Sequence, residues 1–173
     1  DKGYGWVGAA GEVAKGWLET RGVLNSKTRR GPNELLASWA AGGLPFGVAV
    51  PNGKYIVTTS LGDWGEYEFV DYNSFALSYQ GKEVYQCVRN RDNLDQWYYA
   101  NKWVDYEPKL NLYDRYVKSR FTQVTQEVDA ADGKLTVQSK SASADNNYVG
   151  AINYIVVSPA AQKDAHSKFL ADL

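Results

Sequence analysis

Alternating apolar and polar positions run through the middle and the end of the chain, and this period of two predicts β-strands. Residues 46–50 alternate in this way, Pro51-Asn52-Gly53 has the composition of a tight turn, and residues 54–61 are rich in β-branched and aromatic side chains. Two such segments around a short turn predict a β-hairpin. The same signals predict further strands at 74–79, 83–88, 116–128, 135–139 and 150–157.

Two other segments have the signals of helices. Residues 34–41 form a short apolar segment, and we expect one or two helical turns there, with Asn33 as the N-cap. Ser158 and Pro159 are residue types that favour the N-cap and the first position of a helix, so we expect a C-terminal helix from there to Leu173. This helix either packs on the strands or connects them to a further part of the protein.

The predicted strands are short, are separated by turns and do not alternate with helices. This organisation favours an all-β fold, an antiparallel β-sandwich, over a parallel α/β sheet. The length of 173 residues suits one domain. We therefore expect a β-sandwich at residues 1–157, followed by a C-terminal helix or linker at 158–173. Because the sequence does not begin with methionine, we expect a processed chain or an excised domain.

Charge and cysteine content exclude several classes of function. The chain has 19 basic and 20 acidic residues, so it lacks the basic surface expected for binding to nucleic acid or to an anionic membrane. Its sequence contains no apolar run near the roughly 20 residues that a membrane-spanning helix needs. The single cysteine, Cys87, excludes an intrachain disulfide and a cysteine-cluster zinc site.

Catalytic signals are weak. A Ser–His or Cys–His pair would need His166, the only histidine, and Cys87 lies in a predicted strand, where a small buried hydrophobe is the usual role. The motifs of serine hydrolases, zinc proteases and P-loop enzymes are absent from the sequence. An acidic cluster could supply the two carboxylates of a glycosidase, although a solvated loop explains it as well: Asp63, Glu66, Glu68 and Asp71. We therefore expect a protein that is not an enzyme.

Aromatic residues give the strongest functional signal. Six Trp and 13 Tyr against five Phe indicate rings that face water or a polar ligand on one side. Sugars have apolar C–H faces ringed by hydroxyls, which proteins bind with flat rings beside amides or carboxylates. Segments 62–67, 93–99 and 145–148 combine both kinds of group outside the predicted strands. The predicted carbohydrate-binding residues are Trp64, Tyr67, Asp63, Trp97, Tyr98, Asp145, Asn146, Asn147 and Trp6.

The order of these strands and turns resembles a malectin-like, galactose-binding-like jelly roll. In that group a strand ending at a proline leads through a glycine turn into a Tyr-x-Val strand, which ends before an acidic residue, as residues 46–63 do here. An Asp-Gly-x-Leu-Thr-Val strand at 132–137, an Asp-Asn-Asn segment at 145–147 and a final strand at 152–157 are also similar. The Gly3-Tyr-Gly-Trp6 segment resembles part of such modules on polysaccharide-degrading enzymes, so the resemblance extends over roughly residues 3–157.

The resemblance implies a non-catalytic carbohydrate-binding module. Its sugar contacts would come from Trp64 and Tyr67 and from the segment 145–147. Related modules often hold a structural calcium ion, for which Asp63, Glu66 and Asp71 are the candidate ligands; no other cofactor is expected. The chain departs from the pattern because it lacks an extra first strand and because residues 89–112 are unusually long and aromatic.

We expect the module to bind a glycan or polysaccharide outside the cell or at its surface, linked covalently to a catalytic or surface domain. One alternative is a structural or protein-interaction sandwich whose rings form a partner interface, where Tyr and Trp are also enriched. A small polysaccharide hydrolase or lyase is the third hypothesis. Packing of the rings over the ends of the core competes with ligand binding at every one of these positions.

Overall fold

The computed structural model describes residues 3–7, 25–28, 33–41, 44–62, 75–87, 109, 111, 121–142 and 151–173. These residues form two five-stranded sheets in which neighbouring strands are antiparallel. The first sheet has the order β1 (Tyr4–Trp6), β4 (Phe46–Ala49), β9 (Lys134–Ser141), β6 (Phe75–Tyr79) and β7 (Lys82–Cys87). The second has the order β2 (Asn25–Thr28), β3 (Ser38–Ala41), β10 (Ile152–Pro159), β5 (Gly53–Leu61) and β8 (Thr122–Ala130).

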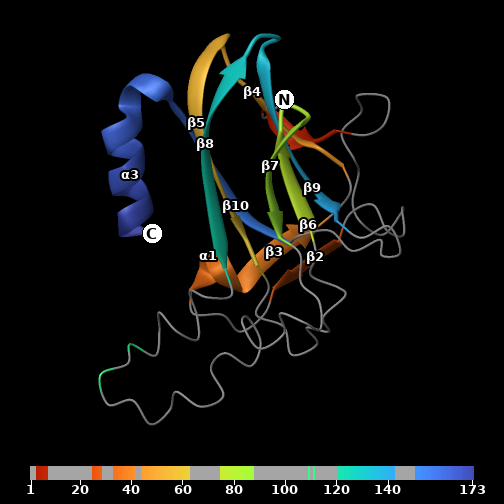
Figure 1. Ribbon diagram of the computed structural model, residues 1–173, viewed down its shortest axis with the longest axis vertical. Coiled ribbons are helices and arrows are strands. Elements are labelled where there is room, and N and C mark those ends of the chain that lie inside the picture. The colour runs from red at the N-terminus through yellow and green to blue at the C-terminus, as the bar shows by residue number, and fades with distance from the viewer. Residues whose placement is uncertain are drawn as a thin grey trace.

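The sheets face each other, and the predicted antiparallel β-sandwich is confirmed (Figure 1). Their facing sides enclose the hydrophobic core, because alternate residues of a strand point to the same side. The buried core residues come from both sheets: Tyr55, Val57, Leu61, Phe75, Leu77, Tyr79, Val124, Val128, Ala130, Leu135, Val137 and Ile152. The strands predicted from residue 46 onward supply all of this list except Ala130, which lies just beyond the predicted segment 116–128.

Strand β5 is buried on both of its sides. Val57 and Leu61 point into the core, whereas Thr58 and Ser60 belong to the opposite, outer side of the second sheet. Thr58 and Ser60 are each 0% exposed. A strand in an antiparallel sheet usually leaves one side to water, so the outer side of β5 has to be covered by other elements.

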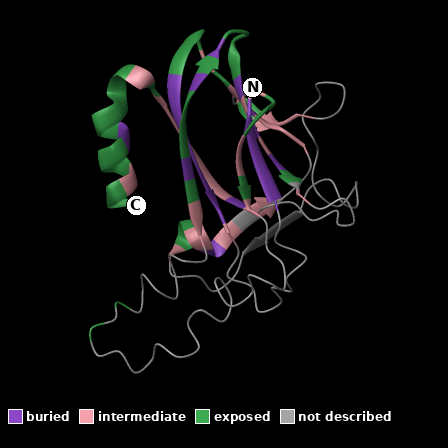
Figure 2. Ribbon diagram, viewed as in Figure 1, coloured by how far each residue is buried: buried purple, intermediate pink, exposed green. Residues whose placement is uncertain are grey.

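A C-terminal helix provides part of that cover. Strand β10 is followed by a 3-10 helix, η6 (Ala160–Gln162), and then by α3 (Lys163–Asp172). Helix α3 lies outside the second sheet (Figure 1), and most of its residues are exposed (Figure 2). Its one buried residue is His166, whose ring contacts Thr58 of β5. The helix therefore packs on the sandwich.

The predicted start of this helix is wrong. Ser158 was expected as its N-cap and Pro159 as its first residue, but both belong to β10 and pair with Ile56 and Tyr55 of β5. The N-cap of α3 is Gln162, whose side chain makes no capping bond. The ladder with β5 extends through both residues, and this long-range pairing outweighs the local capping signal.

The first helix is shorter than predicted. Helix α1 spans only Glu34–Ala37, and the expected N-cap is confirmed, because Asn33 Oδ1 accepts a hydrogen bond of 2.8 Å from the backbone N–H of Leu36. Residues 38–41, predicted to continue the helix, form β3 instead. They pair with β2 along four residues and with Ile152 of β10, and local helix signals cannot compete with these hydrogen bonds.

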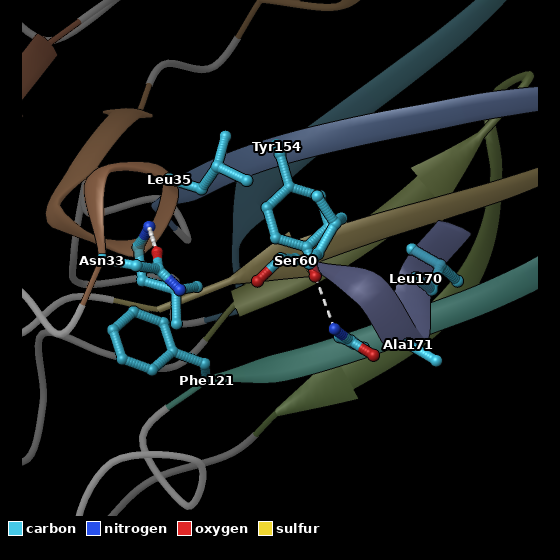
Figure 3. A pocket seen from close by; sticks show the side chains of 10 residues that line it. Asn33, Leu35, Ser60, Phe121, Tyr154, Leu170 and Ala171 are labelled. Atoms are coloured by element: carbon cyan, nitrogen blue, oxygen red, sulfur yellow. Dashed lines mark hydrogen bonds between the residues drawn. The ribbon is translucent and has the colours of Figure 1, made fainter. Parts of the chain in front are cut away.

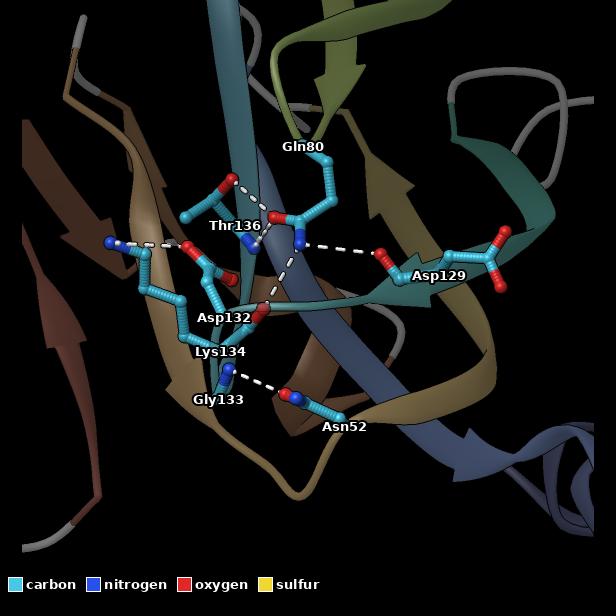
Figure 4. Close-up of polar contacts among 7 residues, drawn as sticks. All are labelled: Asn52, Gln80, Asp129, Asp132, Gly133, Lys134 and Thr136. Atoms are coloured by element: carbon cyan, nitrogen blue, oxygen red, sulfur yellow. Dashed lines mark hydrogen bonds and ion pairs between the residues drawn. The ribbon is translucent and has the colours of Figure 1, made fainter.

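One end of the sandwich is held by side chains that reach across turns (Figure 4). Gln80 Oε1 accepts hydrogen bonds of 2.9 Å from both the N–H and the hydroxyl of Thr136. Its Nε2 donates to the carbonyl of Lys134 at 3.0 Å. Asn52 Oδ1 accepts a bond of 2.8 Å from the N–H of Gly133, whose φ of 76° suits glycine. The predicted turn at Pro51-Asn52-Gly53 therefore lies beside the turns that contain Gln80 and Gly133.

None of the helices in the described segments is long and apolar enough to cross a membrane.

Candidate functional site

Most of the predicted binding residues lie outside the described residues. These are Asp63, Trp64, Tyr67, Trp97, Tyr98, Asp145, Asn146 and Asn147, and the calcium ligands Asp63, Glu66 and Asp71 also fall there. In the described segments, the structure has no group of three or more His, Cys, Asp or Glu side chains that could hold a metal ion. Trp6 is the one predicted sugar-binding residue whose surroundings the structure describes.

The strand ends beside the three predicted sugar-binding segments lie at one end of the sandwich. In the second sheet, Leu61, the last residue of β5, pairs with the first residues of β8 and β10. In the first sheet, Phe75, the first residue of β6, pairs with the last residues of β7 and β9. The other ends of these strands carry the turns joined by Gln80 and Asn52. The chain therefore leaves and re-enters both sheets at the end opposite those turns.

Trp6 belongs to an aromatic cluster on the edge of the first sheet. It pairs with Phe46 across β1 and β4, and the two rings meet edge to face, with centroids 5.2 Å apart and an interplanar angle of 77°. The ring centroids of Tyr4 and Phe46 lie 6.2 Å apart, and Tyr4 is 59% exposed. Trp6 itself is half-buried and packs against the core. The cluster thus leads from the core to the surface.

These rings line a cavity of about 460 Å³ between the two sheets. A volume of this size is within the range of small-molecule sites. Strands β1 and β4 supply an aromatic wall, and β3 and β10 supply an aliphatic wall with two polar residues. The described lining residues are Tyr4, Trp6, Phe46 and Val48 from the first sheet and Ala40, Ile152, Asn153, Tyr154, Ile155 and Val157 from the second.

Asn153 is the most informative polar residue of this cavity. It lies in a β-bulge, where the register with β5 shifts between Ile152 and Tyr154. Its Nδ2 donates to the carbonyls of Ser38, at 3.1 Å, and Gly62, at 3.0 Å. Its Oδ1 is buried and finds no hydrogen-bond partner among the described residues. The two carbonyls determine the amide orientation, since the reversed amide would place its oxygen against both of them.

Sequence reasoning missed Asn153 as a site residue. The residue lies within a segment of strand-forming side chains, Ile152 to Val157. The pattern there predicts a strand and gives the Asn153 side chain no role in binding. A bulge depends on the register of two strands, which the local pattern does not contain. The only signal was the presence of an amide side chain in an otherwise apolar strand.

Two buried titratable groups among the described residues, His166 and Tyr79, take part in hydrogen bonds within the fold. Burial lowers the pKa of His166, and its ring nitrogens contact the hydroxyls of Thr58 and Ser158, each at 2.8 Å. Burial raises the pKa of Tyr79 to about 12, and its hydroxyl lies 2.9 Å from Thr59 Oγ1 and 2.9 Å from the Val124 carbonyl oxygen, to which it donates. These groups hold strands and helix together inside the fold. His166, the histidine that any Ser–His pair would need, is instead part of a buried network of hydroxyl groups.

No protein-family model and no curated protein matches this sequence. Among solved structures, the YXIM protein of Bacillus subtilis aligns at 13% identity with a TM-score of 0.51, over 91% of this chain and 32% of that chain. A chain in the complex of the plant peptide RALF23 with FER and LLG2 aligns at 12% identity with a TM-score of 0.51, over 83% and 35%. A family 35 carbohydrate-binding module from Clostridium thermocellum aligns over 91% and 93%, at 11% identity with a TM-score of 0.40.

The first two alignments show that this β-sandwich fold recurs in other proteins. This chain spans about a third of the length of each of those two solved chains. The identities are low, and the likeness therefore concerns the arrangement of the strands.

Proposed function

We propose that the chain is a non-catalytic carbohydrate-binding module. The observation that carries this proposal is the combination of exposed and half-buried rings with an unpaired amide oxygen around one cavity. The rings of Tyr4, Trp6 and Phe46 offer an apolar surface, and Asn153 Oδ1 offers an acceptor that the described part of the fold leaves unused.

Such a site suits the chemistry of a sugar. The C–H face of a pyranose ring packs on an aromatic ring, and a sugar hydroxyl donates a hydrogen bond to an acceptor held in place. The orientation of Asn153 Oδ1 is fixed before binding, because its amide is held by the carbonyls of Ser38 and Gly62. The described lining of this cavity contains no carboxylate of the kind that glycosidases use, which supports binding rather than bond cleavage.

The cavity would be one part of a larger binding surface. The segments that carry Trp64, Trp97 and Asp145 connect to strand ends at one end of the sandwich, so their rings and amides could meet one glycan chain. A calcium ion held by Asp63, Glu66 and Asp71 would stiffen that surface. The domain would be extracellular or at the cell surface and joined to a catalytic or surface domain, which it would keep close to its polymer.

The test is retention on glycans. Wild-type protein is run on polysaccharide affinity gels and on a glycan array, next to Tyr4→Ala, Trp6→Ala and Trp64→Ala. Phe169→Ala is the matched control, because Phe169 is 51% exposed on α3 and does not line the cavity. We expect selective retention by wild type and the control, and a loss of about tenfold in the other variants.

Tyr4→Ala is the decisive variant, since Tyr4 is exposed and its removal should leave the fold intact. Retention that is unchanged in Tyr4→Ala and Trp6→Ala would remove the cavity from the glycan site. Wild-type protein that binds none of the plant, algal and animal glycans would overturn the proposal and favour a protein-interaction surface. A parallel run with a chelator would report whether calcium contributes.

A further inference from the structure

A second cavity, of about 530 Å³, lies on the outer side of the second sheet between α1 and α3. We call it the outer pocket. Figure 3 shows its floor, formed by Ser60 and Tyr154, with residues of α1 on one side and residues of α3 on the other. Its described lining residues are Asn33, Leu35, Leu36, Ser60, Phe121, Gln123, Tyr154, Leu170, Ala171 and Leu173. It shares only Tyr154 with the cavity between the sheets.

The floor is a row of uncharged polar groups across three neighbouring strands. Ser60 of β5 pairs directly with Gln123 of β8 on one side and with Tyr154 of β10 on the other. The three side chains therefore share one face of the sheet. Gln123 Nε2 donates a hydrogen bond to the Tyr154 hydroxyl, which joins the two ends of the row.

Ser60 is the unusual member of this row. The residue is 0% exposed, and its Oγ finds no hydrogen-bond partner in the part of the chain that the structure describes. A buried hydroxyl without a partner destabilises a fold, because it has lost its bonds to water without replacing them. An unsatisfied buried group at a cavity floor is explained when a ligand supplies the missing bond.

The walls are apolar. Leu35 and Leu36 of α1 form one side, and Leu170 and Leu173 of the C-terminal region form the other. None of the described lining residues is a Lys, Arg, Asp, Glu or His. A charged ligand would lose its hydration there without gaining an opposite charge from any of these side chains, which is unfavourable.

We propose that the outer pocket binds an uncharged amphiphile, a small molecule with an alkyl chain or an apolar ring and a hydroxyl or carbonyl group. The apolar part lies between the leucines of α1 and α3, and the polar group forms a hydrogen bond with Ser60 Oγ. This proposal is independent of glycan binding, because the rings of Tyr4 and Trp6 line the other cavity.

The experiment titrates the whole chain with n-octanol and, separately, with octanoate at about pH 8, where the carboxylate is ionised. Backbone amide NMR spectra follow both titrations. We expect saturable shifts from n-octanol at residues that line the outer pocket, with octanoate binding at least about tenfold more weakly. Equal affinity for the two probes would overturn the proposal, as would n-octanol that gives no saturable shift there.

Two serine variants separate a ligand contact from a structural effect. Ser60→Ala removes the unpaired hydroxyl of the floor and should weaken n-octanol binding about threefold to tenfold, the range of one uncharged hydrogen bond. Ser139→Ala is the matched control, because Ser139 is 1% exposed, also has an unpaired Oγ among the described residues, and lies in β9 outside the pocket. We expect it to bind n-octanol like wild type.

If a serine variant binds n-octanol more weakly, its stability shows whether a ligand contact was lost or the fold was disturbed. Removing an unsatisfied buried hydroxyl should leave the melting temperature unchanged or raise it, in both serine variants. A Ser60→Ala protein that is at least as stable as wild type and binds n-octanol more weakly supports the proposal. A stable Ser60→Ala protein with wild-type affinity for n-octanol would overturn it.

Discussion

The Nε2 atom of His166, on α3, lies 2.8 Å from the Oγ1 atom of Thr58, on β5, and joins the C-terminal helix to a strand inside the second sheet, between β10 and β8. The other ring nitrogen lies 2.8 Å from Ser158 Oγ, and Thr58 Oγ1 lies 2.8 Å from Thr125 Oγ1. His166 is 3% exposed. Since a neutral imidazole has one donor and one acceptor, both of its polar atoms are used, and this network positions α3 over the sheet.

Removing the imidazole should weaken the docking of α3. In His166→Ala, the hydroxyls of Thr58 and Ser158 lose their shared partner, and a small cavity replaces the ring. We expect a loss of about 1–3 kcal/mol in the free energy of unfolding, measured with urea. Ser167→Ala changes an exposed neighbour on the same helix and should stay near wild type. An unchanged midpoint in His166→Ala would show that this contact contributes nothing to stability.

Acid should destabilise the protein through the same residue. Burial lowers the pKa of His166 in the folded state below its ordinary value of 6.5, so the unfolded chain binds a proton first as the pH falls. Stability from this group is therefore present above about pH 6.5 and declines between that value and the folded-state pKa. Urea unfolding at about pH 8 and about pH 5 should show a smaller difference between wild type and His166→Gln in acid. A difference that is the same at both pH values would contradict this expectation.

Gln80 combines a side-chain network with an unusual backbone. Its φ is 51°, in the left-handed region, and its side chain binds Thr136 and the Lys134 carbonyl. Gln80→Ala loses these bonds and keeps the backbone strain, and we expect it to cost about 2 kcal/mol in unfolding free energy. Gln80→Gly loses the same bonds but accommodates the backbone, so it should be about 1 kcal/mol more stable than the alanine variant.

The control for Gln80 is Gln86→Ala, which truncates an exposed glutamine of β7. It should unfold at the wild-type urea concentration. If Gln80→Ala and Gln80→Gly prove equally stable, the left-handed backbone contributes no strain.

Tyr79 should make the protein sensitive to strong alkali. Burial raises its pKa from 10.0 to about 12, so the folded state keeps a proton that the unfolded chain loses. Stability from this group is complete below about pH 10 and declines as the pH rises toward 12. Tyr79→Phe should lose about 1–2 kcal/mol at neutral pH, because Thr59 and the Val124 carbonyl lose a partner, and its stability should depend less on alkaline pH.

Denaturant unfolding at neutral and alkaline pH measures both effects. Tyr4→Phe is the comparison, because Tyr4 is 59% exposed and its substitution removes a hydroxyl from the surface rather than from the core. A Tyr79→Phe protein that follows the wild-type alkaline profile would exclude Tyr79 as the group responsible.

Local patterns determined the strands from residue 46 onward, the turns between them and the N-cap of α1. The alternation in residues 54–61 and the turn at Pro51-Asn52-Gly53 are each complete within a few residues, so they could be identified without a partner strand. The choice of an antiparallel β-sandwich followed from the spacing of these segments. The candidate sugar-binding loops were also local, since each contains its own rings and amides.

Pairing between strands that are distant in the sequence decided the features that local patterns did not predict. Residues 38–41 became a strand, and Ser158 stayed in one, because hydrogen bonds to distant strands outweigh a local helix signal. The bulge at Asn153 and the row of Ser60 with Gln123 and Tyr154 depend on the register between strands, which no single segment contains. The sequence by itself determined which segments extend and which turn; the tertiary structure decided which polar atoms found partners, and thereby where the cavities have unpaired ones.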